Sequence, residues 1–147
     1  MRWIVLLLVP SAVHAADLTG TWSDSNDSEQ AGIYRLLVIQ HSDRIYFRYV
    51  SNSVHRCEVI GMADQRASQP HLYIFRNDDA HQTSPGYEGY GFEENEDCEV
   101  SFELDESTLK VRATGNCRSF CGLNGSIGGD LHQISSDKPS PESLVPP

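Results

Sequence analysis

The chain has 147 residues and a formal net charge of −10, from 21 acidic and 11 basic side chains. This is the length of one domain, and it is enough to bury a real hydrophobic core. The excess of carboxylates argues against nucleic-acid binding, because neutralising phosphates requires lysine and arginine. Basic proteins, cationic peptides or divalent cations are the partners that this charge favours.

Residues 1–15 are typical of a secretory signal peptide. Arg2 supplies the positive start, residues 3–9 form an apolar run, and Val13-His14-Ala15 offers small or apolar side chains before a cleavage site. The apolar run is far shorter than the roughly 20 residues that span a bilayer. We therefore expect cleavage near Ala15 and a mature protein that is not membrane-inserted, in the periplasm or outside the cell.

The rest of the chain alternates apolar and polar residues with period two, which is typical of β-strands. The three residues 41–43 suit a hairpin connection. The most regular hairpin joins 98–104 to 109–115, where apolar side chains alternate with charged or polar ones. The expected strands, in chain order, are 18–23, 33–40, 44–50, 55–62, 71–76, 98–104, 109–115 and a closing strand within 120–131.

These strands predict one all-β domain over 16–134, an antiparallel meander barrel of about seven or eight strands stapled by disulfides. A closed barrel is favoured because closure removes the unpaired sheet edges that a small secreted protein would have to protect. Residues 135–147 contain four prolines and few side chains to bury. They predict a disordered tail.

Four cysteines, an even number in an exported chain, predict disulfides. We favour Cys57–Cys98 with Cys117–Cys121, because the second pair can close a compact local loop. Cys98–Cys117 with Cys57–Cys121 is the alternative, because the last hairpin places Cys98 opposite Gly115. The spacing offers only half of a zinc motif and no Cys-x-x-Cys redox pair. No nucleophile motif is present either, so we expect no catalytic residue, metal or cofactor.

A long acidic segment, 77–96, shows no periodicity. Connections of this length are uncommon unless they are functional or mobile. Clustered carboxylates and tyrosines can form a protein-binding surface for a basic partner, although they can also be a solvated face or a weak calcium site. The candidate partner-binding residues are Tyr87, Tyr90, Glu93, Glu94, Glu96 and Asp97. Glycosylation sequons at Asn26 and Asn124 matter only in a host that uses them.

The first expected strand carries Leu18-Thr19-Gly20-Thr21-Trp22. Gly20 lets the chain enter a barrel without side-chain crowding, and Trp22 can plug the closed end. The segment resembles the opening strand of the calycin barrels, meaning lipocalins and avidins. This resemblance implies a closed barrel and, as an alternative function, a lipocalin-like carrier of a small apolar ligand.

The second half of the chain resembles small periplasmic domains found in bacterial proteins related to lysozyme inhibitors. The residues that carry this likeness are Cys57, Cys98, Cys117, Cys121, Gly122 and Gly125. The resemblance implies an exported β-barrel and, beyond it, inhibition of a lysozyme-type cell-wall hydrolase. We therefore expect a non-enzymatic binding protein whose partner is basic.

Overall fold

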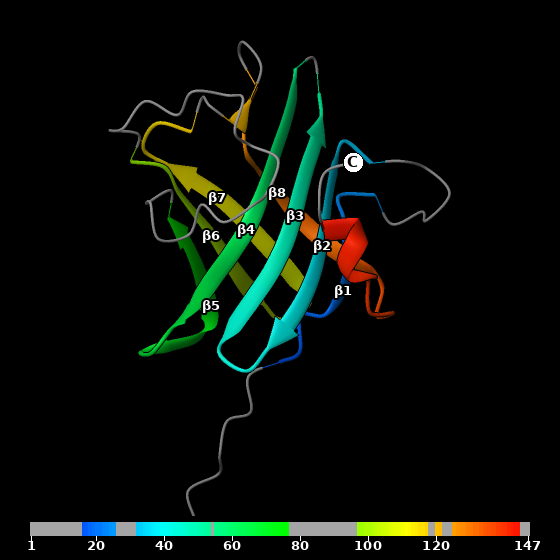
Figure 1. Ribbon diagram of the computed structural model, residues 1–147, viewed down its shortest axis with the longest axis vertical. Helices are drawn as coiled ribbons and strands as arrows, with labels where there is room; N and C mark the ends of the chain where they lie inside the picture. The colour runs from blue at the N-terminus through cyan, green and yellow to red at the C-terminus, as the bar shows by residue number, and fades with distance from the viewer. Residues whose placement is uncertain are drawn as a thin grey trace, which may run out of the picture.

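The computed structural model describes residues 16–25, 32–53, 55–76, 97–117, 120–121 and 125–144. Eight antiparallel strands follow one another in chain order and close into a barrel in which β1 pairs with β8 (Figure 1). The strands are β1 Gly20–Ser23, β2 Tyr34–His41, β3 Arg44–Asn52, β4 Arg56–Arg66, β5 Gln69–Arg76, β6 Glu99–Asp105, β7 Thr108–Thr114 and β8 Gly128–Ser135. The expected all-β meander barrel with disulfides is confirmed.

The largest departures from the expected strand bounds are in β4 and β8. β4 continues four residues past the predicted end at 62, so that only the turn 67–68 separates it from β5. The closing strand β8 begins only at Gly128. Phe120 and Cys121 lie outside it, and Cys121 pairs with Cys57 instead. Ser135, expected in the tail, is the last residue of this strand.

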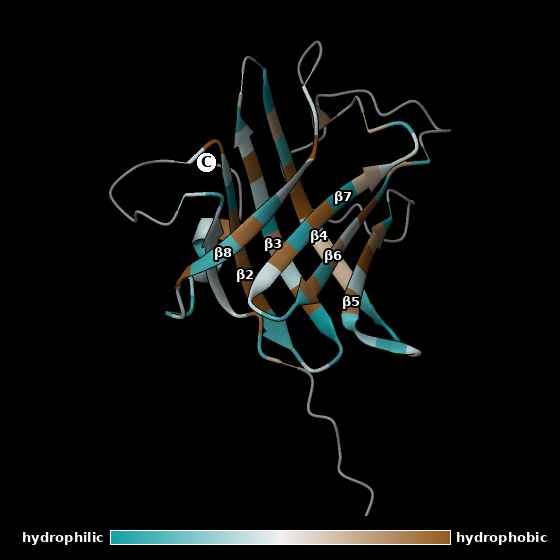
Figure 2. Cartoon of the chain, turned by 180° about the vertical axis from the view of Figure 1, so that it is seen from behind, coloured by the Kyte–Doolittle hydropathy of each residue, from teal (hydrophilic) through white to brown (hydrophobic). Residues whose placement is uncertain are grey.

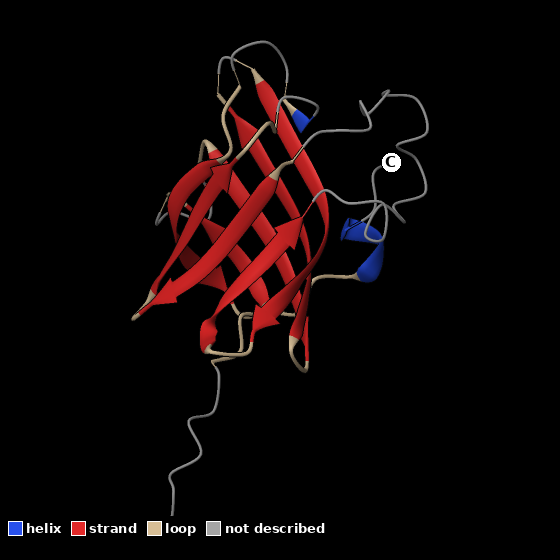
Figure 3. Cartoon of the chain, turned by 90° about the vertical axis from the view of Figure 1, so that its left-hand side faces the viewer, coloured by secondary structure: helices blue, strands red, loops and turns tan. Residues whose placement is uncertain are grey.

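The barrel has two unlike ends, which Figure 3 shows with the tilted strands between them. At one end, which we call the tight-turn end, two-residue turns join β2 to β3, β4 to β5 and β6 to β7. Ser42 and Glu106 in these turns adopt positive φ. At the opposite end, the loop end, the chain makes the longer connections β1–β2, β5–β6 and β7–β8.

Inward side chains fill the barrel, and the alternation of apolar and polar residues along the strands is visible in Figure 2. The ring centroids of Phe47 and Phe102 lie 4.6 Å apart, and those of Phe47 and Phe75 lie 5.5 Å apart. An eight-stranded barrel is just wide enough for side chains to fill it. The largest fully buried side chains are Tyr49, Tyr73, Phe47, Phe102, Leu18, Leu36, Ile45, Leu109 and Leu131.

The opening motif lies where the barrel closes on itself. Gly20 has φ of 141°, and a Cβ on it would overlap the carbonyl oxygen of Ser135 on the neighbouring β8. A side chain is therefore excluded here by the close approach of the two strands. Trp22 is buried, and its indole Nε1 donates a hydrogen bond to the Leu18 carbonyl oxygen at 2.9 Å.

The C-terminal segment is more ordered than its composition predicts. Pro141–Leu144 form a short 3-10 helix, η2, which packs against β3. Leu144 is buried, and Nη1 of Arg48 donates to the Ser143 carbonyl oxygen at 3.1 Å. The expectation of a disordered tail is wrong for these residues, because one leucine finds apolar cover on the barrel wall. Residues 1–15 and 145–147 lie outside the described residues.

Across the described part of the chain, no helix has the length and apolar character needed to cross a membrane.

Candidate functional site

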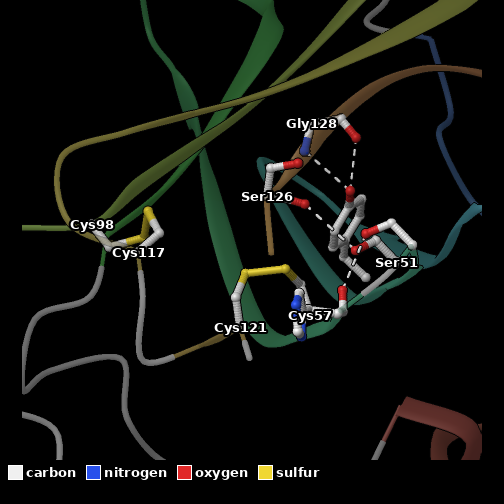
Figure 4. Close-up of a disulfide and its surroundings, with 10 residues drawn as sticks. Ser51, Cys57, Cys98, Cys117, Cys121, Ser126 and Gly128 are labelled. Carbon is white, nitrogen blue, oxygen red and sulfur yellow. Dashed lines mark hydrogen bonds between the residues drawn. A yellow bond between two sulfur atoms is a disulfide. The ribbon is translucent and has the colours of Figure 1, made fainter. Parts of the chain in front are cut away.

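Both disulfides lie at the loop end of the barrel (Figure 4). Cys57, the second residue of β4, is bonded to Cys121, and Cys98, directly before β6, is bonded to Cys117, which follows β7. The favoured pairing, Cys57–Cys98 with Cys117–Cys121, is therefore wrong and the alternative is correct. Disulfides of this kind indicate an oxidising environment, such as that of exported proteins.

Strand order explains the pairing. β5 lies between β4 and β6, so Cys57 and Cys98 are separated by two strand spacings, about 9–10 Å. That distance exceeds the Cα separation of about 7 Å that a disulfide can bridge. In contrast, the β6–β7 register places Glu99 opposite Thr114, which brings the residues just beyond them together. The Cα atoms of Cys98 and Cys117 are 4.8 Å apart.

Phe120 fills the core at the loop end, between the two bridges. Its ring packs edge-on against Phe75 with centroids 5.9 Å apart, and the side chain is 8% exposed. The Phe120 amide donates to the Cys117 carbonyl oxygen at 3.2 Å, which turns the chain here. Cys117 ties this turn to the start of β6, and Cys121 ties it to β4. We call Cys117, Phe120 and Cys121 the plug.

Sequence reasoning missed the plug, because it placed Phe120 in the closing strand. The available signal was a large aromatic residue flanked closely by two cysteines.

A buried hydroxyl network fixes the start of β8 to β3. The Tyr49 hydroxyl donates to the Gly128 carbonyl oxygen at 2.7 Å and accepts from the Gly128 amide at 3.1 Å. Ser51 Oγ donates to the Ser126 carbonyl oxygen at 3.5 Å. Burial raises the pKa of Tyr49 to about 12, despite the opposing effect of the hydrogen bond to Gly128. The neutral phenol therefore acts as a structural clamp on Gly128, which Figure 4 labels together with Ser126 and Ser51.

The neck of the β1–β2 connection is held by a second set of polar contacts. Asp24 Oδ1 accepts from the Tyr34 amide at 2.9 Å. Ser23 Oγ donates to the Tyr34 carbonyl oxygen at 3.1 Å and accepts from the Ser25 amide at 3.2 Å. These contacts tie together the two ends of the β1–β2 connection. The sequon asparagines, Asn26 and Asn124, lie outside the described residues.

Of the predicted partner-binding residues, Asp97 is described, and it is exposed at the loop end directly before Cys98. The strands that the acidic segment connects are also tied to each other, because Arg76 Nε and Glu99 Oε2 lie 3.0 Å apart. The other predicted residues lie outside the described part of the chain: Tyr87, Tyr90, Glu93, Glu94 and Glu96. The structure thus gives the two anchor points of the segment, at Arg76 and Asp97.

In the described ranges, no group of three or more histidine, cysteine, aspartate or glutamate side chains is arranged to hold a metal ion. All four cysteines are in disulfides.

Comparisons with protein-family models, with curated proteins and with solved structures gave no match. The function therefore has to be argued from the chemistry of this chain.

Proposed function

We propose that this chain is an exported, non-enzymatic binding protein whose loop end recognises a basic protein. A lysozyme-type cell-wall hydrolase is the partner class that the cysteine layout favours. The observation that carries the proposal is that an acidic segment is anchored at both ends on a rim fixed by two disulfides. The N-terminal signal sequence would place the mature protein in the periplasm or outside the cell.

Charge supports a basic partner. Residues 77–97 contain no lysine or arginine and carry seven carboxylates: Asp78, Asp79, Glu88, Glu93, Glu94, Glu96 and Asp97. A concentration of one sign of charge accelerates the encounter with an oppositely charged partner and selects against acidic ones. Because the effect is electrostatic, it should weaken as salt rises.

The rigid rim supports binding rather than mere solubility. Binding loops work best when a fixed scaffold positions their ends, because less conformational freedom remains to be lost on association. Here Cys98 follows Asp97 directly, and the Cys98–Cys117 bridge holds this end of the segment. The Arg76–Glu99 ion pair joins the strand that leaves to the strand that returns.

The alternative, a lipocalin-like carrier of a small apolar ligand, has less support. Carriers need an internal cavity of roughly 300–1,000 Å³ lined by apolar side chains. In this barrel the inward positions hold large aromatic residues packed on one another, including Phe47, Phe75 and Phe102. Phe120 adds a fourth ring to this cluster at the loop end.

The test uses the mature protein from Ala16, oxidised and checked for its disulfides. Turnover of a cell-wall suspension by a lysozyme-type hydrolase is measured with and without it at micromolar concentration. A variant that neutralises the acidic cluster carries Glu93→Gln, Glu94→Gln, Glu96→Gln and Asp97→Asn. A matched control neutralises four carboxylates at or near the tight-turn end: Glu103→Gln, Asp105→Asn, Glu106→Gln and Asp130→Asn.

We expect inhibition by the natural protein and by the control, and a loss of at least about tenfold in potency for the cluster variant. Unchanged turnover would remove this class of hydrolase as the target. Direct binding to immobilised basic proteins of other classes then tests the broader proposal. Equal weakening by both variants would show that net charge, rather than the loop end, is recognised.

A further inference from the structure

The outside of the barrel has two chemically different walls. On β6 and β7 the outward side chains are mostly charged and ion-paired, as in Arg112–Asp130 and Lys110–Asp105, each at 2.6 Å. On β2, β3 and β4 apolar side chains take many of the outward positions: Leu37, Ile39, Tyr46, Val50, Ile60 and Met62. Tyr46 is 39% exposed, one of two large hydrophobic side chains that stand out into solvent among the described residues.

The outward residues of β3 and β4 form cross-strand rows set by the register. We call these four rows the β3–β4 wall. From the tight-turn end upward, the rows are Arg44 with Asp64, Tyr46 with Met62, Arg48 with Ile60, and Val50 with Glu58. The basic members lie on β3 and the acidic members lie on β4. Both opposite-charge pairs are already formed within one copy, since Arg44 Nε lies 2.6 Å from Asp64 Oδ1 and Arg48 Nη2 lies 2.6 Å from Glu58 Oε1.

Such a wall is complementary to itself. A twofold axis that runs parallel to the strands, between β3 and β4, lays β3 of one copy on β4 of the other, row by row. Tyr46 then meets Met62 of the second copy, a favourable aromatic–sulfur contact. Arg44 meets Asp64 of the second copy, so that the four charges alternate in sign. We propose that the β3–β4 wall is the interface of a twofold homodimer.

A second copy is the occupant that the charges favour. The chain as a whole carries −10, so that two copies repel one another across most of their surface. On the β3–β4 wall, however, Arg44 and Arg48 balance Asp64 and Glu58. The barrel closes through β1 and β8, so we place the contact on the side chains of the wall and not on a strand edge.

The C-terminal helix η2 contacts the third row of this wall. It packs against β3 and accepts the Arg48 hydrogen bond through Ser143. In Figure 1, η2 lies beside β2. Tyr46 lies one row nearer the tight-turn end than Arg48, and its side chain is exposed.

The size of the wall predicts a weak dimer. With strands about 4.8 Å apart and about 3.3 Å per residue, the rows and their flanking strands cover roughly 400 Å² per copy. This amounts to about 800 Å² in total, which is smaller than standard specific interfaces, so we expect only a weak and transient association.

Sedimentation velocity over about 5 to 500 µM, with the oxidised mature protein, tests the proposal. We expect a monomer–dimer equilibrium that Tyr46→Asp weakens at least about tenfold, because it places a carboxylate at the centre of the apolar row. Ile33→Asp is the matched control, since Ile33 is the other exposed large hydrophobic side chain and lies at the loop end beside Asn52, beyond the last row of the wall and far from Tyr46. A monomer throughout the range, or equal weakening by both substitutions, would overturn the proposal.

A charge exchange tests the twofold geometry itself. Arg44→Asp alone and Asp64→Arg alone should each weaken self-association, because like charges then face one another. An equimolar mixture of the two variants should recover it, because every introduced carboxylate faces an arginine of the other variant. Loss of the ion pair within one copy cannot produce this recovery. A mixture no stronger than the separate variants would refute the arrangement, whatever Tyr46→Asp does to folding.

Discussion

Replacing the cysteines of either bridge by alanine should destabilise the barrel by an amount set mainly by the length of the closed loop. Cys57 and Cys121 are 64 residues apart in sequence, and Cys98 and Cys117 are 19 apart. Loop-closure entropy then gives about 4 kcal/mol for the longer bridge and about 3 kcal/mol for the shorter one. The bridges are nested, so an intact Cys98–Cys117 bridge shortens the loop that Cys57–Cys121 closes. Its effective length is then 41 (98 − 57) plus 4 (121 − 117) residues. This lowers the larger value only slightly.

Urea unfolding at 25 °C, followed by circular dichroism, measures these losses in the two double variants. Each variant should remain folded if the domain has about 10 kcal/mol of total stability, which is ordinary for its size. The m-value should rise as well, because the unfolded chain becomes more expanded. The reasoning would be refuted if the shorter bridge contributed more than the longer one by over about 1 kcal/mol.

The pairing can be verified directly, because trypsin separates all four cysteines. Arg66 and Arg76 lie between Cys57 and Cys98, Lys110 and Arg112 between Cys98 and Cys117, and Arg118 between Cys117 and Cys121. Mass spectrometry of a non-reduced digest should show the Cys57 peptide joined to the Cys121 peptide. A Cys57–Cys98 peptide would contradict the structure.

Three further substitutions probe the loop end and the closure. Tyr49→Phe should cost about 1–3 kcal/mol at pH 7, because the buried Gly128 groups lose their partner. The natural phenol has a folded pKa of about 12, above its ordinary 10, so its stabilising effect is complete below pH 10 and is lost as the pH rises to 12. Urea unfolding at pH 7 and pH 11 should show a smaller alkaline loss in the variant; an equal loss would contradict the assignment. Gly20→Ala should cost at least about 2 kcal/mol of stability, because the φ of Gly20 is positive and the Ser135 carbonyl oxygen occupies the space of a Cβ. Thermal unfolding measures this loss, and Gly128→Ala is the control, because Gly128 has room for a Cβ. Phe120→Ala should lower the free energy of unfolding by roughly 3 kcal/mol while both disulfides still form, and Phe120→Leu should lower it by less than half as much. Urea unfolding measures both losses.

The barrel could be predicted from sequence because its strands have one buried face. The hairpin 98–104/109–115 alternates strictly, and β6 and β7 lie within one residue of those bounds. The end of β4 was missed because its residues do not alternate in this way. Asp64 and Gln65 are polar neighbours, which hides the alternation, and their bonds to Arg44 and to the Tyr73 hydroxyl are visible only once the strands are paired.

The disulfides and the C-terminal helix depend on which elements become neighbours. Alternation showed that Cys57 and Cys98 point inward, but it could not show that β5 separates them. The composition of the last residues correctly indicated little to bury. A single side chain, Leu144, nevertheless finds a site on a wall that no local pattern could have identified.

The two bridges lie where the connections between strands are long and cost the most conformational entropy on folding. The tight-turn end needs no cross-link, because its hairpins close over two residues each. At the loop end, long connections cost conformational entropy, and the bridges and the plug offset that cost where it arises. Under the proposed function, changes in residues 77–96 should alter partner preference while the free energy of unfolding stays nearly constant, as expected of a recognition loop on a stable support.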